Sequence, residues 1–267
     1  MKRLAMLLLA VLVLAVPVAC KKGAETPIEP TQAPGEVPNP LAGIFEQMLT
    51  KRDEAFGKLA QKLEGYSYSG VGADRTALVE TVMRPFSDAS TELAPLIVNN
   101  VYMQDDGSGV RWEVRSAERD GDVVQEQGQL QLDCLSYYEA DADGAVREQR
   151  QTCEASLDGT RITAKLYNRL PGENEAMNMR FEYELRGNTH YMQIWYSLNF
   201  GDGFTLLRVV YDDTSLRYGV FENAVDEPAS LYGNTFEEGI FTDALTTVEY
   251  AGASVTIVNE ERQTIIP

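Results

Sequence analysis

Hydrophobic residues recur along this chain with two different periods, and the period changes near residue 101. From 41 to 63 they lie three or four positions apart, which places them on one face of a helix. Segments at 75–83 and 87–98 have the same helical character, with prolines nearby that interrupt helices. We therefore expect residues 41–100 to be helical.

Beyond residue 101 hydrophobic and polar residues alternate one by one, and turn dipeptides divide the sequence about every ten residues. The clearest alternation is at 177–186, where one set of side chains is apolar and the other polar or charged. Such strands bury one face and expose the other, which is typical of antiparallel sheets. We expect a meander of about eight strands over 110–222. Two more strands are expected at 246–250 and 253–258.

Tight turns predict which residues face each other on neighbouring strands. A two-residue loop at Asp158–Gly159 places Ala155 beside Ile162. The same reasoning at Asp143–Gly144 places Cys134 directly opposite Cys153, within reach of a disulfide, which secreted proteins favour. Further loops predict five more facing pairs: Phe181 with Ile194, Leu166 with Phe181, Leu198 with Leu206, Val210 with Leu216, and Trp112 with Leu130.

A sheet of about eight to ten strands has to curve, and its apolar face then needs a cover. It can close into a barrel, or the N-terminal helices can pack into its concave side. The predicted fold class is α+β, with N-terminal helices packed on a large, curved antiparallel meander that forms a half-barrel or a barrel. In outline this arrangement is similar to the half-barrel with a helical lid of bacterial lipoprotein carriers, and less so to a lipocalin-type barrel.

The chain begins with Lys2 and Arg3, followed by an apolar run that ends at Cys20. A basic start, a short apolar run and a small residue before a cysteine resemble the signal of a bacterial lipoprotein precursor, although Pro17 stands where that family usually has leucine. The resemblance implies a signal peptide at 1–19, palmitate or another acyl chain on Cys20, and a place on the extracytoplasmic side of the bacterial cell envelope.

Proline and small polar residues are frequent from 20 to 40, a composition typical of a disordered tether. Residues 41–267 then form a single globular domain, helical over 41–100 and antiparallel sheet over 101–267. The acyl anchor would be its contact with the membrane.

Charge and motifs narrow the possible functions. The formal charge is −18 at pH 7, and a surface this negative repels nucleic acid. His190 is the only histidine, and the register places it opposite Leu185 at the edge of the apolar face. No phosphate loop, nucleophile elbow or paired-cysteine motif is present. We expect no metal, no cofactor and no nucleic-acid partner, and we name no catalytic residue.

Two sets of residues are candidates for binding. The outer face carries aromatic and arginine side chains that the register aligns in one row: Tyr137, Arg150, Tyr167, Arg180 and Trp195. This row either stiffens a solvated sheet or binds sugars or an anionic partner. The inner face carries a second set, which either fills the core or lines a site for an apolar ligand: Met177, Met179, Phe181, Met192 and Ile194.

Three functional hypotheses follow. The first is a non-enzymatic, membrane-anchored carrier or binding module that holds an apolar ligand between sheet and helices. The second is a surface scaffold that binds protein or glycan through its outer sheet face. The third is a hydrolase that uses a pair of the 41 acidic residues, none of which the sequence singles out.

Overall fold

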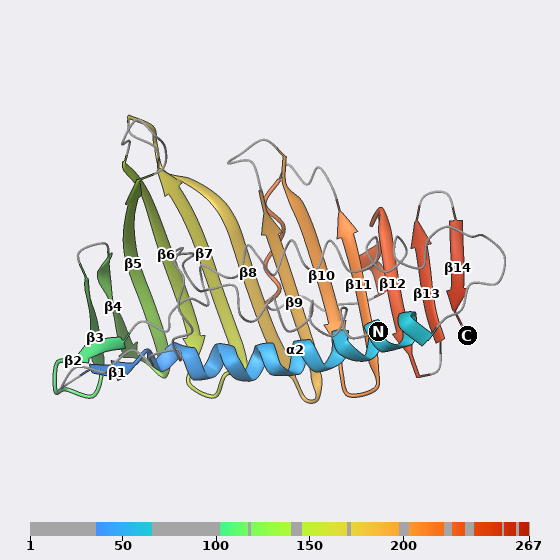
Figure 1. Cartoon of the computed structure of the whole chain (residues 1–267), viewed down its shortest axis with the longest axis horizontal. Coiled ribbons are helices and arrows are strands. Elements are labelled where there is room, and N and C mark those ends of the chain that lie inside the picture. Colours follow the sequence, from blue (N-terminus) through green and yellow to red (C-terminus); the bar gives the residue numbers. More distant parts are fainter. Residues whose placement is uncertain are drawn as a thin grey trace, which may run out of the picture.

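The structure is a computed structural model that describes residues 36–65, 102–116, 119–139, 146–169, 172–197, 203–221, 226–232, 238–252, 254–259 and 262–266. The helices expected at 75–83 and 87–98 lie outside these residues, as do the leader, Cys20 and most of the tether. Within the described part, one long helix packs against one large antiparallel sheet (Figure 1).

In the described residues fourteen strands form the sheet, and strands that follow one another in the sequence pair with each other. The strands are β1 (Glu36–Pro38), β2 (Tyr102–Asp105), β3 (Arg111–Ser116), β4 (Arg119–Glu126), β5 (Gln129–Glu139), β6 (Val146–Ser156), β7 (Arg161–Arg169), β8 (Ala176–Arg186), β9 (Thr189–Tyr196), β10 (Thr205–Tyr211), β11 (Ser215–Phe221), β12 (Thr246–Ala251), β13 (Ser254–Asn259) and β14 (Arg262–Ile266). The α+β class and the antiparallel meander are confirmed. The expected number of about eight to ten strands is too low, and the described sheet is open and curved (Figure 1).

The helix α2 (Pro40–Gly65) confirms the first predicted helix. Its start is capped by Asn39, whose side-chain oxygen accepts a hydrogen bond of 2.9 Å from the Leu41 amide. The helix crosses the inner face of the sheet near one end of the strands (Figure 1), where the Phe45 ring lies 6.4 Å from that of Phe181. Among the described residues, no helix combines the length and the apolar character needed to cross a membrane.

The core lies between α2 and the inner face of the sheet. On β7, Ile162, Ala164 and Leu166 are buried, whereas the residues between them are partly exposed. This alternation is the one that the sequence indicates, because successive side chains of a strand point to opposite faces. On β10 and β11, Tyr211 and Tyr218 are among the largest fully buried side chains.

Two hairpins have the predicted register. Ala155 faces Ile162 across β6 and β7, and Phe181 faces Ile194 across β8 and β9. The two tail strands predicted from the sequence are β12 and β13. In these two hairpins the turn residues determined the register.

The pairs predicted across other connections are wrong. Leu166 faces Met179 instead of Phe181, with a bulge between Leu166 and Tyr167. The remaining corrections are Leu206 opposite Trp195, Leu216 opposite Tyr211, and Trp112 opposite Val123. A bulge or a longer loop changes the number of residues between strands, and the hydrophobic pattern alone does not fix that number. For Trp112 the expected turn itself was misplaced, because Asp120–Gly121 lies inside β4 and β3 already ends at Ser116.

The two cysteines do not face each other. Cys134 is paired with Gln151, and Cys153 with Leu132, so the register of β5 and β6 differs by two residues from the predicted one. A two-residue offset keeps both sulfurs on the inner face but makes the cysteines diagonal neighbours, roughly 7–8 Å apart. A disulfide requires a shorter separation, roughly 4.4–6.8 Å between Cα atoms. The structure accordingly holds both as free, buried thiols.

Candidate functional site

The outer face of the sheet, opposite α2, is hollowed over β3 to β7. This cavity has a volume of about 670 Å³. Three arginines and six acidic residues line it, and we call them together the charged hollow: Arg111, Arg150, Arg169, Glu113, Asp120, Asp122, Asp133, Glu148 and Glu175. Because acidic groups outnumber basic ones, the hollow is negatively charged.

Strand pairing sets the order of the side chains at the centre of the hollow. Arg150 on β6 is paired with Tyr167 on β7. Glu148, two residues before Arg150, lies between Tyr137 on β5 and Arg169 on β7. Two tyrosines therefore neighbour charged residues on the hydrogen-bonded sheet.

The arginines of the hollow are held by carboxylates. Arg150 donates from Nε to Asp133 Oδ1 at 2.9 Å and from Nη2 to Oδ2 at 2.5 Å, a fork that fixes both side chains. These hydrogen bonds raise the pKa of Arg150. Two further pairs have the same chemistry: Arg169 with Glu148, and Arg111 with Asp122. The side chains of Arg150 and Asp133 are 43% and 52% exposed, so a ligand can reach them.

The predicted outer row is wrong as a continuous feature: Tyr137, Arg150, Tyr167, Arg180 and Trp195 do not align. Only Arg150 with Tyr167, and Arg180 with Trp195, are paired. The row is broken because Tyr137 is paired with Glu148, and Arg180 with Lys165. Trp195 is 5% exposed and its ring stacks on Phe204 at 3.9 Å. Of the row, Arg150 lines the charged hollow, and Tyr137 and Tyr167 are its neighbours through their pairing with Glu148 and Arg150.

The residues proposed for an apolar ligand belong to the packed core. Met179, Phe181, Met192 and Ile194 have 0% exposure. Met177 does not share their face, because the bulge in the pairing of β7 and β8 places it opposite Tyr167 on the outer side. Of the two interpretations left open by the sequence, core packing is the one this arrangement favours.

A second polar cluster lies under residues 226–232, which cross the outer face of β7 to β9 and which we call the strap. Glu182 on β8 is 2% exposed and accepts four hydrogen bonds, from Arg180, Gln193, Ser230 and the Leu231 amide. Arg180 also pairs with Glu227 at 2.6 Å. The buried charge of Glu182 is thus fully hydrogen-bonded, and it holds the strap on the sheet.

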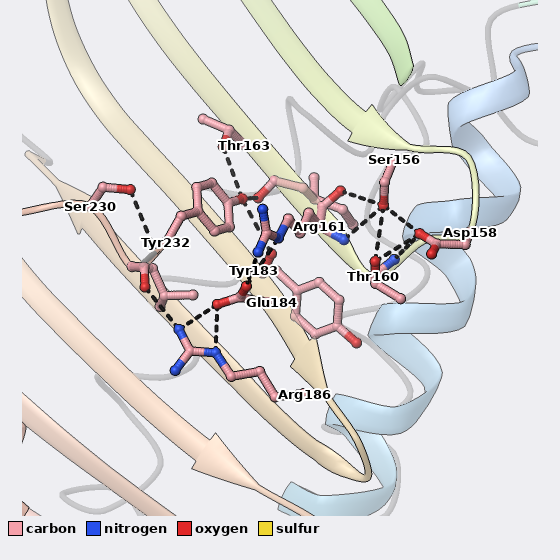
Figure 2. A network of polar contacts seen from close by, with 12 residues as sticks. Ser156, Asp158, Thr160, Arg161, Thr163, Tyr183, Glu184, Arg186, Ser230 and Tyr232 are labelled. Atoms are coloured by element: carbon pink, nitrogen blue, oxygen red, sulfur yellow. Dashed lines mark hydrogen bonds and ion pairs between the residues drawn. The ribbon is translucent and has the colours of Figure 1, made fainter. Parts of the chain in front are cut away.

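Figure 2 shows the other contacts that fix the strap. Glu184 pairs with Arg161 at 2.8 Å and with Arg186 at 2.5 Å, and Arg186 donates to the carbonyl oxygen of Leu231 in the strap at 3.1 Å. Tyr232 donates from its hydroxyl to the carbonyl oxygen of Ile162 at 2.5 Å, and burial raises its pKa. All these groups have partners within the chain, so we assign the cluster to the attachment of the strap.

His190 lies on the inner side, opposite Leu185 as predicted. Its Nδ1 is 2.8 Å from the Tyr183 hydroxyl, and its ring stacks on Tyr211 with centroids 4.5 Å apart. Burial lowers the pKa of His190, with a smaller effect of the same sign from Lys51. The ring is therefore a packed, neutral side chain at the seam between sheet and helix.

Sequence reasoning found Arg150 and the two tyrosines beside the hollow, and it found Arg180 of the strap cluster. It missed the acidic residues of the hollow and the other members of the strap cluster. The alternation on β5 and β6 did contain the signal, since Asp133 and Glu148 share a face with Arg150.

Within the described residues, no three His, Cys, Asp or Glu side chains gather in a way that could hold a metal ion. Comparison of the chain with models of protein families, curated proteins and solved structures finds no match.

Proposed function

We propose that this protein is a lipid-anchored, extracytoplasmic binding module that takes its ligand on the outer face of its sheet, in the charged hollow. The anchor is proposed from the basic and apolar leader that ends at Cys20, and from the proline-rich segment after it. Such a tether would hold the sheet away from the membrane and leave its outer face accessible.

The charged hollow is the observation that carries the binding role. It combines a cavity of about 670 Å³ with exposed, mutually oriented polar side chains on a rigid sheet. The carrier hypothesis has less support, because the side chains that would line an interior site are 0% exposed in the packed core. Of the first two hypotheses, binding through the outer face therefore has the better support.

The hydrolase hypothesis gains no specific support. Asp122 and Asp133 are directly paired across β4 and β5. Each is held by an arginine, Asp122 at 2.8 Å and Asp133 at 2.5 Å. A carboxylate held in this way is poorly placed to attack a substrate or to deliver a proton.

Metabolic labelling tests the anchor. The full chain expressed in a bacterial host with radioactive palmitate should become labelled, and Cys20→Ser should abolish the label. Cys134→Ser, at a buried thiol, is the matched control and should retain it. Undiminished label in the Cys20→Ser protein would rule out lipidation at this position.

Carboxylate footprinting tests binding in the hollow without assuming a ligand. Purified full-length protein is treated with a carbodiimide and an amine, with and without a solubilised cell-envelope fraction, and the modified residues are quantified by mass spectrometry. Asp133 and Glu175 should be protected, while Glu249, exposed on β12, should react equally in both samples. Equal reactivity at all three carboxylates would contradict the proposed function.

A further inference from the structure

The chemistry of the charged hollow also restricts what kind of ligand it suits. At its centre, acceptor and donor groups stand side by side, Asp133 beside Arg150 and Glu148 beside Arg169. A carboxylate only accepts hydrogen bonds and a guanidinium only donates them. A ligand that matches both must carry groups that donate and accept at adjacent positions, which is what neighbouring hydroxyl groups of a sugar ring do.

The ion pairs are present before any ligand arrives. Both oxygens of Asp133 are engaged by the fork of Arg150, so the rotamers are already fixed and little side-chain freedom is lost on binding. Within each pair the opposite charges also offset one another. A neutral ligand can therefore bridge acceptor and donor without an unpaired charge being buried.

Two tyrosines paired with lining residues of the hollow offer the apolar part of such a site. Tyr167 is paired with Arg150, and Tyr137, 37% exposed, is paired with Glu148. A tyrosine presents a flat apolar face together with a polar edge. The C–H face of a sugar can pack on one ring while its hydroxyls reach the adjacent ion pair.

Charge argues against the other ligand chemistries. Six acidic residues against three arginines make the hollow repel an anion. A cationic ligand would be attracted at long range, but the carboxylates at the centre already have guanidinium partners, which it would have to displace.

We infer that the ligand of the charged hollow is a neutral carbohydrate, bound by the Asp133–Arg150 and Glu148–Arg169 pairs and packed on Tyr137 and Tyr167. The inference rests on the proposed function and names its ligand class. The residues that touch the sugar lie on three neighbouring strands, β5, β6 and β7.

The test uses the full chain in detergent on a printed array of neutral and anionic oligosaccharides, with poly-L-lysine as a cationic probe. Neutral oligosaccharides should bind, and Arg150→Lys should weaken this binding at least tenfold because lysine lacks the fork. Tyr167→Ala should cause a similar loss. Two matched controls should bind as the wild type does: Lys165→Arg, on the same strand as Tyr167, and Glu249→Gln, on β12.

The outcomes separate the ligand class from the proposed function. Footprinting protection of Asp133 and Glu175 by envelope material, together with binding of anionic oligosaccharides or poly-L-lysine only, would overturn the carbohydrate class and leave a binding hollow. Neutral oligosaccharide binding that persists in Arg150→Lys and Tyr167→Ala would overturn the assignment of the site. Both variants concern side chains on the sheet surface, and circular dichroism verifies that each one folds.

Discussion

The attachment of the strap gives the sharpest prediction about stability, through the single substitution Glu182→Gln. Both oxygens of this buried carboxylate accept two hydrogen bonds each. Oε1 accepts from Arg180 at 2.6 Å and from Ser230 at 2.8 Å, and Oε2 from Gln193 at 3.1 Å and from the Leu231 amide at 2.8 Å. Glutamine replaces one of these acceptors with an amide group that only donates.

The size of the destabilisation depends on which of two orientations the new amide adopts, and the less costly one decides it. Turned toward Gln193 and Leu231, it would oppose two N–H donors. Turned toward Arg180 and Ser230 it costs less, because the serine hydroxyl can rotate and accept. One hydrogen bond from a guanidinium to a charged acceptor is then lost, worth about 1.5–3 kcal/mol, and Arg180 loses part of its buried countercharge. We expect the strap to be destabilised by about 2–4 kcal/mol in total.

Hydrogen exchange followed by mass spectrometry measures the stability of the strap separately from that of the rest of the protein. A peptide that covers residues 226–232 should exchange about 30-fold faster or more in Glu182→Gln than in the wild type, since about 1.4 kcal/mol corresponds to a factor of ten. Peptides from α2 and from β5 should keep their rates, because the change lies on the other face or on distant strands. The control Glu249→Gln, at an exposed carboxylate, should leave the strap unchanged.

Two results would refute this reasoning. Strap exchange within threefold of the wild type would mean that the charge of Glu182 does not hold the strap. Loss of protection across the whole sheet would mean that the cluster stabilises the fold as a unit, and that the strap is no separate element.

Three further predictions concern groups elsewhere in the chain. Burial raises the pKa of both Cys134 and Cys153, so neither thiol should react with a disulfide reagent at pH 8 until urea unfolds the protein; an intact mass two hydrogens lower before reduction would reveal a disulfide instead. Burial lowers the pKa of His190 below its unfolded value of about 6.5, so its contribution to stability is complete above that pH and is lost as pH falls toward the folded pKa. Replacement of His190 by glutamine should flatten the dependence of the urea midpoint on pH in this range. An unchanged slope would mean that another group causes this pH dependence. Gly219→Ala should destabilise by about 1–3 kcal/mol in urea denaturation, because the new Cβ would lie 2.7 Å from Phe241 Cδ1; a neutral effect would show that Phe241 yields easily.

Where local chemistry fixes a turn, the fold could be predicted from the sequence. The connection between β6 and β7 is an example: the Asp158 carboxylate accepts a hydrogen bond of 3.0 Å from the Thr160 amide, and Gly159 has a φ of 69°. These residues permit essentially one loop and hence one register. Between β5 and β6 the connection spans 140–145, and the Asp-Gly dipeptide within it did not determine the pairing. The predicted disulfide depended on that pairing.

The sequence alone could not show which part of the outer face is covered and which is accessible. Alternation marks a position as outer without indicating whether another segment covers it. Glu182 and Gln193 occupy outer positions of β8 and β9, yet each is 2% exposed under the strap. Burial of such groups is costly unless every hydrogen bond is made, and the strap, from a distant part of the chain, supplies several of them. The strap therefore covers the outer face of β8 and β9 and the part of β7 near Thr163, while Arg150 and Arg169, farther along β7, remain accessible. A ligand that approaches the described outer face can reach the charged hollow but not the buried carboxylates, and this division is why we place binding at the hollow.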